Sequence, residues 1–449
     1  MDLEGFVRRR LLAGCDDAEA ADALAERISE FKNWSREQRL RFAGAVVEEV
    51  RSSLGYLELE DGFLKELLGY ASAGVSMGEF GVGSRGEGDF FVHRRLAQIV
   101  GSTSAVIGPG EQDDAGVIKG EAGYITVAVD GMHSRLSEFP FLAGFHAARA
   151  ALRDVCVMGS KPRALISDLH LADDGDVGKL FDFTAGVACV GELCSAPLIA
   201  GSTLRVGGDM VFGERLVASV AAVGTSDEPP KARRNAEPGD VILLTEGRGG
   251  GTVTTIAIYH RRYDVVKETL NVEFMKACEV LIRRGLLGEV HTMSDVTNGG
   301  VRGDAWEISR TAGRKLVFFE DELYRSINAR VLRMLQELEI DPLGISTDSL
   351  MLILPEEAAS RVKEALRGVA KVYEAGRVEV GRGVYIAADG GERELGRRFR
   401  EAAYTKVKKV VGEEEPGDME KMKRRIEEAA ARAVRKKLAV KRFIQEELR

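Results

Sequence analysis

The stretch HTMSDVTNGGV, residues 291–301, joins an apolar run to a glycine-rich turn and then to the helix-like sequence VRGDAWEIS. Asp295 stands where the apolar run ends, and Asn298, Gly299 and Gly300 follow it. A glycine-rich turn that leads into a helix presents backbone N–H groups to an anion. A carboxylate able to hold a metal and a turn able to hold phosphate are therefore neighbours in this sequence.

Three further acidic motifs precede this stretch, and each adjoins an apolar run. They are GPGEQDDAGVI (108–118), YITVAVDGMH (124–133) and ARAALRDVCVMGSKP (148–162). Carboxylates that converge from distant segments repel one another unless a cation neutralises them, and Mg²⁺ prefers such oxygen ligands. Because Mg²⁺ commonly accompanies nucleotide phosphates, the set predicts an ATP site. The glycine-rich turn EGRGGGTVTTIAIY (246–259) lacks the Lys-Ser/Thr of a Walker P-loop, so this site is of another kind.

The local setting of the aspartates in these three motifs indicates what each could do. Adjacent carboxylates in an extended chain point in different directions, so one of Asp113 and Asp114 can hold metal while the other braces the loop. Asp130 ends a strand, at the edge where α/β sheets place ligands. Asp154 lies in an apolar helix, where it needs either a metal or an arginine as its partner.

Composition narrows the class of protein. The chain has 449 residues, 45% of them hydrophobic and 30% charged, which predicts a folded protein of two or three domains. A net charge of −8 gives no basic field for nucleic acid or an acidic membrane. Five cysteines without a C-x-x-C pair favour a reducing compartment, and no apolar run approaches membrane-spanning length, so we expect a cytoplasmic protein. We interpret His133 and His146 as structural rather than catalytic.

The sequence divides into four parts. We expect a helical N-terminal extension over 1–75, a first α/β domain over 76–228, a second over 229–395 and a charged helical tail over 396–449. Apolar positions three to four residues apart predict the first helices, with Asp16 and Ser35 as N-caps. The Pro-rich, charged stretch DEPPKARRNAEPGD (227–240) separates the two α/β domains.

The segment SAGVSMGEFGVGSRGEGDFFVH (72–93) is rich in glycine. Its glycines argue against a regular element and permit close approach of the backbone to a ligand. Phe90 and Phe91 need a surface to pack on, so we favour a functional loop over a surface linker.

The tail carries a thin apolar stripe, including Met419 and Ile426, beside basic runs at 421–425 and 435–437. We favour a helix that packs on its own body or on a protein partner over one that binds RNA.

In this order, the four acidic motifs resemble those of the AIR synthase-related (PurM-like) superfamily over about residues 80–390. Its members include AIR synthase, selenophosphate synthetase, thiamine-monophosphate kinase and a hydrogenase-maturation dehydratase. The resemblance implies two α/β (α+β) domains. The N-terminal domain binds ATP and metal, and its sheet pairs with that of a second copy in a β-barrel, making a homodimer. The C-terminal domain closes over the site.

The resemblance also implies roles for matching residues. The expected ligands of Mg²⁺ are Asp114, Asp130, Asp154 and Asp295. The residues expected to bind ATP are Gly81, Gly83, Gly86, Asp113, Asn298, Gly299 and Gly300. Asp295 is expected to act in catalysis. Arg85, in the segment where relatives carry a lid over the phosphates, is expected to contact the transferred phosphoryl group, since arginine suits bidentate phosphate contact.

Some positions depart from the family pattern. Relatives often carry a Gly-Gly-Asp/Glu-Thr motif where this chain has IAGSTLRVGGDM (199–210), with Ser202 at the acidic position and Asp209 as a potential substitute. The lid segment has no cysteine, which argues against the selenophosphate reaction. The sequence IQEELR lacks the terminal cysteine of the hydrogenase-maturation protein.

Together these features predict an ATP-dependent enzyme that uses Mg²⁺ to transfer a phosphoryl group to a small-molecule substrate, or to activate it. The accepting atom would be an amide or carbonyl oxygen, or a phosphate. The alternative is a nucleotide-binding regulatory or assembly protein with little turnover, whose tail docks a partner; Ser202 and the two helical extensions favour it.

Overall fold

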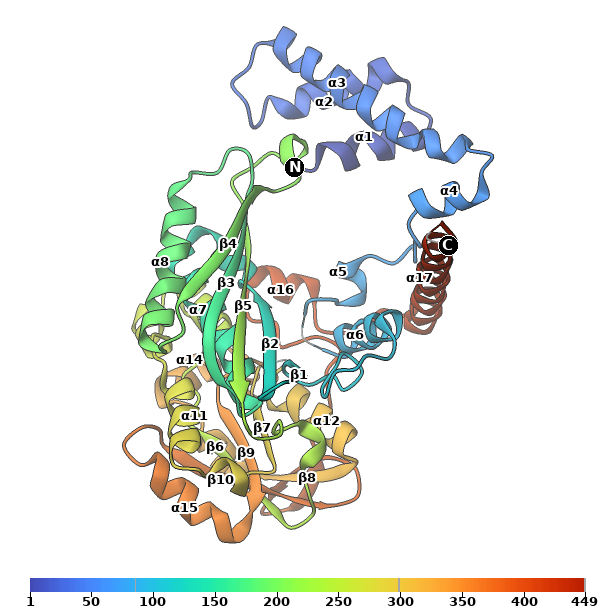
Figure 1. Cartoon of the computed structure of the whole chain (residues 1–449). Coiled ribbons are helices and arrows are strands. Elements are labelled where there is room, and N and C mark those ends of the chain that lie inside the picture. The colour runs from blue at the N-terminus through green and yellow to red at the C-terminus, as the bar shows by residue number, and fades with distance from the viewer. Residues whose placement is uncertain (85, 298, 448–449) are drawn as a thin grey trace.

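The computed structural model describes residues 1–84, 86–297 and 299–447 (Figure 1). Two β-sheets with covering helices form the body, which confirms the predicted α/β class. The N-terminal helices lie beyond one end of the five-stranded sheet, and the seven-stranded sheet lies beyond the other (Figure 1). None of the described helices combines the length and the apolar character that a membrane span requires.

The five-stranded sheet has the order β1-β2-β5-β3-β4. Its strands are β1 (Gly116–Gly120), β2 (Gly123–Gly131), β3 (Lys161–Leu171), β4 (Leu198–Arg205) and β5 (Leu216–Ser226). Strands β3 and β4 are parallel, and the other neighbouring pairs are antiparallel. Helices α7 (Pro140–Val157) and α8 (Gly178–Leu193) cover one face (Figure 1).

The other face of this sheet is apolar and exposed. Val129 on β2 is 68% exposed, and Val217 on β5 is 51% exposed. Their neighbours Ala128 and Ala218 are buried against the helices, as the alternation of side chains along a strand requires.

The seven-stranded sheet has the order β12-β11-β8-β10-β6-β9-β7. Its strands are β6 (Asp240–Thr245), β7 (Thr292–Asp295), β8 (Arg314–Phe319), β9 (Leu350–Pro355), β10 (Val372–Val380), β11 (Gly383–Ala388) and β12 (Gly391–Glu394). Its helices are α9 (Gly251–Tyr259), α10 (Tyr263–Thr269), α11 (Glu273–Arg283), α12 (Val301–Ala312), α13 (Glu320–Arg325), α14 (Ala329–Glu337) and α15 (Glu356–Leu366). Strands β8 and β11 are parallel, and the remaining pairs are antiparallel.

Both faces of this second sheet are buried. Leu352 on β9 packs into a core that includes side chains of α7, α11 and α15. Its neighbours Met351 and Ile353 pack into a second core that includes side chains of α12 and α14. Because β9 is buried on both faces, its sequence LMLILP is a continuous apolar run.

The N-terminal extension is helical, as predicted. Helices α1 (Leu3–Leu12), α2 (Asp17–Ile28) and α3 (Arg36–Leu54) share a small core, and Phe212 from the loop between β4 and β5 enters it beside Trp34 and Phe42. The side chains of Asp16 and Ser35 cap α2 and α3. Helix α4 (Gly62–Leu68) lies apart from this core, where Phe63 stacks on Phe443 of the tail.

The glycine-rich segment is more regular than predicted. It contains α5 (Met77–Phe80) and the start of α6 (Glu87–Val100), so the expectation that its glycines exclude regular elements is wrong. For α5 the cause is helix capping: Ser76 and Glu79 form a capping box on it, and Gly81, at φ 71°, ends it.

The tail forms α16 (Lys406–Val411) and α17 (Met419–Glu447). Helix α17 packs on α6, where Met419 joins Phe80 and Phe91 in a small apolar cluster and Arg95 pairs with Glu427 at 2.6 Å. The stripe of the tail therefore packs on the protein's own body.

Candidate functional site

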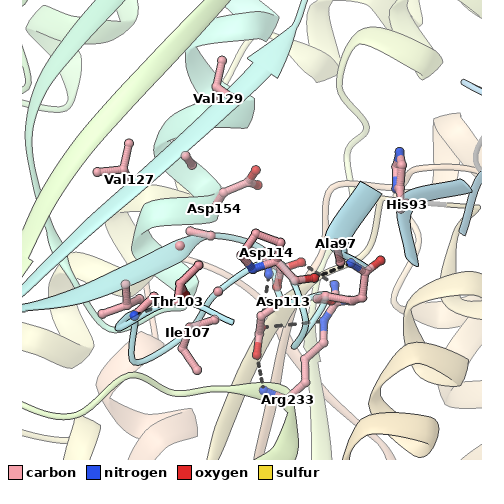
Figure 2. Close-up of a pocket in the computed structure, with 18 of the residues that line it drawn as sticks. His93, Ala97, Thr103, Ile107, Asp113, Asp114, Val127, Val129, Asp154 and Arg233 are labelled. Carbon is pink, nitrogen blue, oxygen red and sulfur yellow. Dashed lines mark hydrogen bonds and ion pairs between the residues drawn. The ribbon is translucent and has the colours of Figure 1, made fainter. Parts of the chain in front are cut away.

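A cavity of about 870 Å³ lies where α6, β1, β2, α7 and the end of β7 meet (Figure 2). Its lining includes all five aspartates singled out in the sequence, namely Asp113, Asp114, Asp130, Asp154 and Asp295. The structure thus brings together carboxylates from motifs that span almost two hundred positions of the chain.

Secondary structure places each of these carboxylates at the end of an element. Asp113 and Asp114 precede β1, Asp130 is the penultimate residue of β2, and Asp295 is the last residue of β7. Asp154 lies in the last turn of α7, a helix whose other residues are mostly buried and apolar. Strand ends and helix ends leave the backbone free to turn, so side chains from separate elements can face one cavity.

Arg233 holds the first group of carboxylates (Figure 2). Its guanidinium is ion-paired with Asp114, and its backbone N–H donates to Asp113 Oδ2 at 3.0 Å. Asp304 Oδ1, on α12, lies 3.7 Å from Arg233 Nη2 and accepts no hydrogen bond. Ser294 Oγ donates to Asp114 Oδ2 at 3.0 Å. All of these side chains are almost fully buried, so the charges are held in a medium of low polarity.

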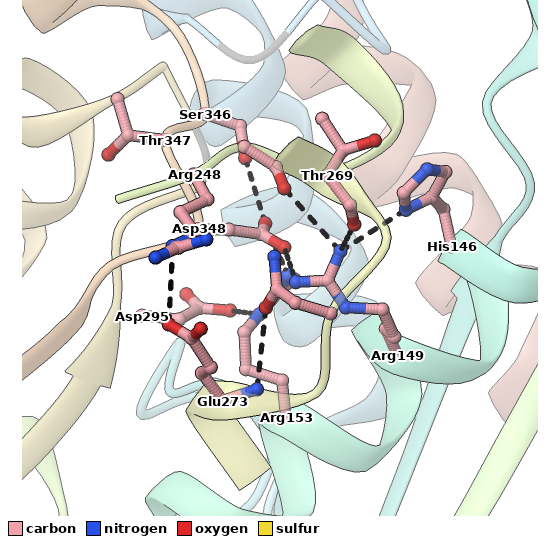
Figure 3. A network of polar contacts seen from close by, with 12 residues as sticks. His146, Arg149, Arg153, Arg248, Thr269, Glu273, Asp295, Ser346, Thr347 and Asp348 are labelled. Carbon is pink, nitrogen blue, oxygen red and sulfur yellow. Dashed lines mark hydrogen bonds and ion pairs between the residues drawn. The ribbon is translucent and has the colours of Figure 1, made fainter. Parts of the chain in front are cut away.

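Arg153 holds the second group (Figure 3). It is ion-paired with Asp295, lies 2.7 Å from Asp348 Oδ1 and is 3.8 Å from Asp154 Oδ1. Arg149 pairs with the other oxygen of Asp348 at 3.0 Å. Burial opposes ionisation of Asp348, but the two guanidiniums lower its pKa below the ordinary value.

Carboxylates outnumber guanidiniums around this cavity, and their pKa values show the effect. Burial raises the pKa of Asp114 to about 7, and the charges of Asp295 and Asp113 add to the rise against the opposing effect of Arg233. Burial, Asp295 and Asp130 raise the pKa of Asp154 well above its usual range. A cluster that cannot ionise fully without a further positive charge fits a divalent cation.

The donor set also suits Mg²⁺. It consists of carboxylate and hydroxyl oxygens without sulfur, and one buried oxygen of Glu307, whose side chain lines the cavity, has no hydrogen-bond partner among the described residues. Across the described residues, however, no three His, Cys, Asp or Glu side chains are arranged as a metal site, because the arginines hold the carboxylates instead. Metal coordination by Asp114, Asp130, Asp154 and Asp295 therefore stays a prediction.

The turn before α12 has the backbone that the sequence suggested. Gly299 and Gly300 have φ of 85° and 70°, and a Cβ on Gly300 would lie 2.4 Å from the carbonyl oxygen of Leu343. Gly299 faces a small void beside Gly86 rather than the large cavity. Asn298 lies outside the described residues, so the proposed phosphate cradle stays a prediction.

The three glycines of the expected lid, Gly81, Gly83 and Gly86, do not line the large cavity. Gly81 packs against Arg400, Gly86 packs against the backbone of Phe399, and Gly83 lines a second, smaller cavity. Arg85 lies outside the described residues. The roles given to these four residues in binding ATP and the transferred phosphoryl group remain predictions.

Ser202 and Asp209 lie at a distance from both cavities. Ser202 is exposed on β4, an edge strand, and Asp209 pairs with Arg205 at 2.6 Å on the surface. Neither residue lines either cavity.

Both histidines considered in the sequence have hydrogen-bond partners. His146 Nε2 lies 2.8 Å from Thr254 Oγ1, and burial, reinforced by Arg149, lowers its pKa to about 3. His133 lies between Thr255 Oγ1 at 3.0 Å and Tyr404 Oη at 2.9 Å. His146 is therefore neutral at physiological pH, which agrees with a structural role.

Sequence reasoning missed several charged residues of the site, above all Arg153, Arg233, Asp304 and Asp348. One signal was available: Asp348 in GISTDSL precedes an apolar strand, the pattern that singled out Asp113 and Asp114. Arg233 lies in a stretch that was interpreted as a domain boundary, and nothing local marks it as buried.

Comparison with known proteins agrees with this arrangement. The AIR synthase related protein N-terminal domain matches residues 112–226, and the corresponding C-terminal domain matches 237–389. A Methanocaldococcus jannaschii protein named uncharacterized protein MJ1416 is 54% identical over 99% of both chains. The chain belongs to the AIR synthase-related family. Thiamine-monophosphate kinase of the same organism is 23% identical over 60% of this AIR synthase-related chain and 86% of its own.

Two solved structures share the fold. The structure of a HypE–HypF complex aligns with a TM-score of 0.56 and 18% identity over 68% of this chain and 99% of its own. AaThiL complexed with AMPPCP and TMP aligns with a TM-score of 0.54 and 18% identity over 70% of this chain and 96% of its own. Both matched family domains lie within 112–389, so the N-terminal helices and the tail are outside them.

Proposed function

We propose that the protein is an ATP-dependent enzyme that binds Mg–ATP in the large cavity and transfers a phosphoryl group to an oxygen of a small molecule, or activates that oxygen. The observation that carries the proposal is the cavity itself. Its lining combines apolar side chains that suit a base, among them Leu96, Val100, Ile118 and Val127, with the clustered carboxylates.

The roles of individual residues follow from this arrangement. Bound Mg²⁺ would offset charge on the phosphates during transfer. Asp114, Asp130, Asp154 and Asp295 would hold the ion. Arg153 and Arg233 keep these carboxylates in place when the ion is absent, because an unpaired buried charge is costly.

Relatives support ATP chemistry in general. One is named a kinase, and a solved structure that shares the fold contains AMPPCP, an ATP analogue, together with TMP. Those names do not give the accepting molecule of this protein, since the kinase is only 23% identical to it and the solved structure only 18% identical.

Two copies are proposed to pair through the exposed apolar face of the five-stranded sheet. Val127 and Val129 lie on this face and also line the large cavity (Figure 2). A second copy there would cover apolar surface and narrow the mouth of the cavity. We further infer a cytoplasmic protein from the reduced state expected of its cysteines.

The alternative function is a nucleotide-binding regulatory or assembly protein with little turnover. It is favoured by the arginines that already occupy the carboxylates, and by the two helical extensions outside the family domains. The two functions differ in whether bound ATP is consumed.

Substitution of the carboxylates tests the proposal. Asp295→Asn and Asp154→Asn should lower Mg²⁺-dependent ATP hydrolysis by about a hundredfold or more, because each removes a charge that would hold the ion. Asp154→Asn is the milder change for folding, since Arg153 has closer partners in Asp295 and Asp348. The surface variant Asp209→Asn is the matched control.

Three outcomes separate the candidate functions. Hydrolysis that is unchanged in both site variants contradicts the assignment of the site. Tight Mg–ATP binding without consumption of ATP across small-molecule acceptors supports the assembly protein. Loss of activity in Asp209→Asn as well would point to a general effect on folding, which a thermal unfolding curve would show.

A further inference from the structure

A second cavity of about 280 Å³ lies directly beside the large one. Asp130, Arg153 and Thr297 line both cavities, so a single layer of side chains separates them. A molecule in the second cavity would therefore lie next to whatever occupies the acidic end of the first.

The tail forms one wall of this second cavity. Glu401, Tyr404 and Lys408 line it, although all three lie outside the family domain that ends at residue 389. Tyr404 Oη lies 2.9 Å from His133 Nε2, and Lys408 Nζ donates to Glu401 Oε1 at 2.7 Å. The wall is held in place by backbone contacts, including the N–H of Ala402 donating to the carbonyl of Gly344 at 3.2 Å.

The same part of the tail also holds the lid. The N–H of Glu87 donates to the carbonyl of Arg398 at 3.1 Å, and the N–H of Glu401 donates to the carbonyl of Ser84 at 2.7 Å. Arg400 Nη2 donates to the carbonyl of Glu79 at 2.8 Å. Gly83 of the lid lines the second cavity, so lid and tail together close this side of it.

Charged groups of both signs line the second cavity, and its carboxylates are Asp130, Asp348 and Glu401. Arg135, Arg153 and Lys408 supply positive charge, and the hydroxyl of Tyr404 can donate a hydrogen bond. Arg153 and Lys408 already pair with carboxylates. The guanidinium of Arg135, by contrast, has no carboxylate partner among the residues that the structure describes. Arginine binds phosphate and carboxylate groups through paired N–H donors.

We propose that this second cavity binds the acceptor substrate, a small molecule with a phosphate or carboxylate group, and that the tail supplies Tyr404 and Lys408 to hold it beside Arg135. The inference rests on the proposed function, because it gives the molecule next to the nucleotide its role as acceptor. In this proposal, segment 398–408 selects the substrate. The two family domains alone would leave the pocket incomplete, because this segment lies outside both of them.

Calorimetric titration tests this assignment. Protein saturated with Mg–AMPPCP is titrated with inorganic phosphate and, separately, with acetate as the carboxylate probe. Phosphate, acetate or both should bind the wild-type protein. Arg135→Gln and Lys408→Gln should each weaken that binding about tenfold, equivalent to about 1.4 kcal/mol, while leaving the affinity for AMPPCP unchanged. Lys406→Gln, an exposed lysine on the same helix, is the matched control.

The outcomes distinguish this inference from the proposed function. Binding of neither probe to the wild-type complex, or unchanged binding in both site variants, overturns the assignment of the pocket. If AMPPCP itself fails to bind, the proposed function fails. The same titration of the nucleotide-free protein then still decides whether Arg135 and Lys408 form an anion site. Arg135→Gln keeps the test decisive if Lys408→Gln, which leaves buried Glu401 without this partner, impairs folding.

Discussion

The two sheets of this protein differ in what covers them. The seven-stranded sheet is buried on both faces, with β9 alternating between two apolar cores. The five-stranded sheet has α7 and α8 on one face and exposes Val129 and Val217 on the other. A sheet face of exposed apolar side chains is typical of an interaction surface. A sheet that is buried on both faces needs no further partner to cover its apolar side chains.

If two copies pair as proposed, the five-stranded sheet serves assembly while the seven-stranded sheet serves stability. The free face runs into the large cavity, because Val127 and Val129 belong to both (Figure 2). The covered sheet contributes Asp295 at the end of β7, close to the place where the two domains meet. Three changes would break or sharpen this comparison.

The largest effect is expected at Arg233, in the segment that joins the two sheets. Arg233→Gln would leave Asp113, Asp114 and Asp304 buried without their common cation, and we expect the free energy of unfolding to fall by about 3–5 kcal/mol. Urea unfolding measures the loss. Arg234→Gln, which removes a half-exposed neighbour, should change stability by less than about 0.5 kcal/mol. Equal losses in the two variants would contradict the picture of a buried charged junction.

A smaller effect is expected on the free sheet face. Val129→Glu would place a carboxylate in each copy on the apolar surface, and we expect the dissociation constant of the proposed dimer to rise about a hundredfold. Analytical ultracentrifugation measures it. Val380→Glu changes a residue that is 82% exposed at the end of β10 in the seven-stranded sheet, and is the matched control. A dimer that survives Val129→Glu but dissociates with Val380→Glu would reverse the comparison.

The smallest effect concerns acid stability at the contact between the domains, where His146 of α7 bonds Thr254 of α9. Burial and Arg149 lower the pKa of His146 to about 3, so the unfolded chain binds a proton below pH 6.5 that the folded protein does not. Because of His146, the free energy of unfolding therefore decreases as the pH falls from 6.5 towards 3. Between pH 6.5 and 5 the cost is about 2 kcal/mol.

His146→Gln should remove this cost. The stability difference between pH 7 and pH 5, measured by urea unfolding, should shrink by about 2 kcal/mol relative to the wild type. His170→Gln, which removes a partly exposed histidine on β3, controls for the loss of a histidine as such. If His146→Gln kept the stability difference of the wild type between pH 7 and pH 5, His146 would have to be protonated in the folded wild-type protein.

Much of the fold could be predicted from the sequence because its strands are apolar runs and its helices have clear periodicity. The run ITVAVDG lies in β2, LMLILP in β9 and GVYIAA in β11. The edge strand β4 was harder to recognise, since almost all of its residues are exposed and it lacks an apolar pattern. Helix α5 and the start of α6 escaped prediction because they lie in the glycine-rich segment, where a capping box stabilises α5 despite the glycines around it.

The candidate site could be predicted only in part, for a related reason. Carboxylates at the ends of apolar strands are visible locally, so Asp114, Asp130 and Asp295 were found. Their ion pairs with Arg153 and Arg233 join residues more than a hundred positions apart. Nothing local in a sequence indicates which distant arginine will be buried beside an aspartate. The contribution of Tyr404 to the second cavity was missed because the tail lay outside the resemblance.

The contacts between lid and tail have a consequence for biosynthesis. Ser84 and Glu401 are hydrogen-bonded beside the second cavity. The ribosome must therefore add more than three hundred residues after Ser84 before this contact can form. The family domains, which end at residue 389, can fold earlier, as domains commonly do during synthesis. A nascent chain would then be able to form the part of the large cavity that its two sheets supply before the tail is available, and a chain cut short by about fifty residues would lack the wall of the second cavity that Glu401, Tyr404 and Lys408 form.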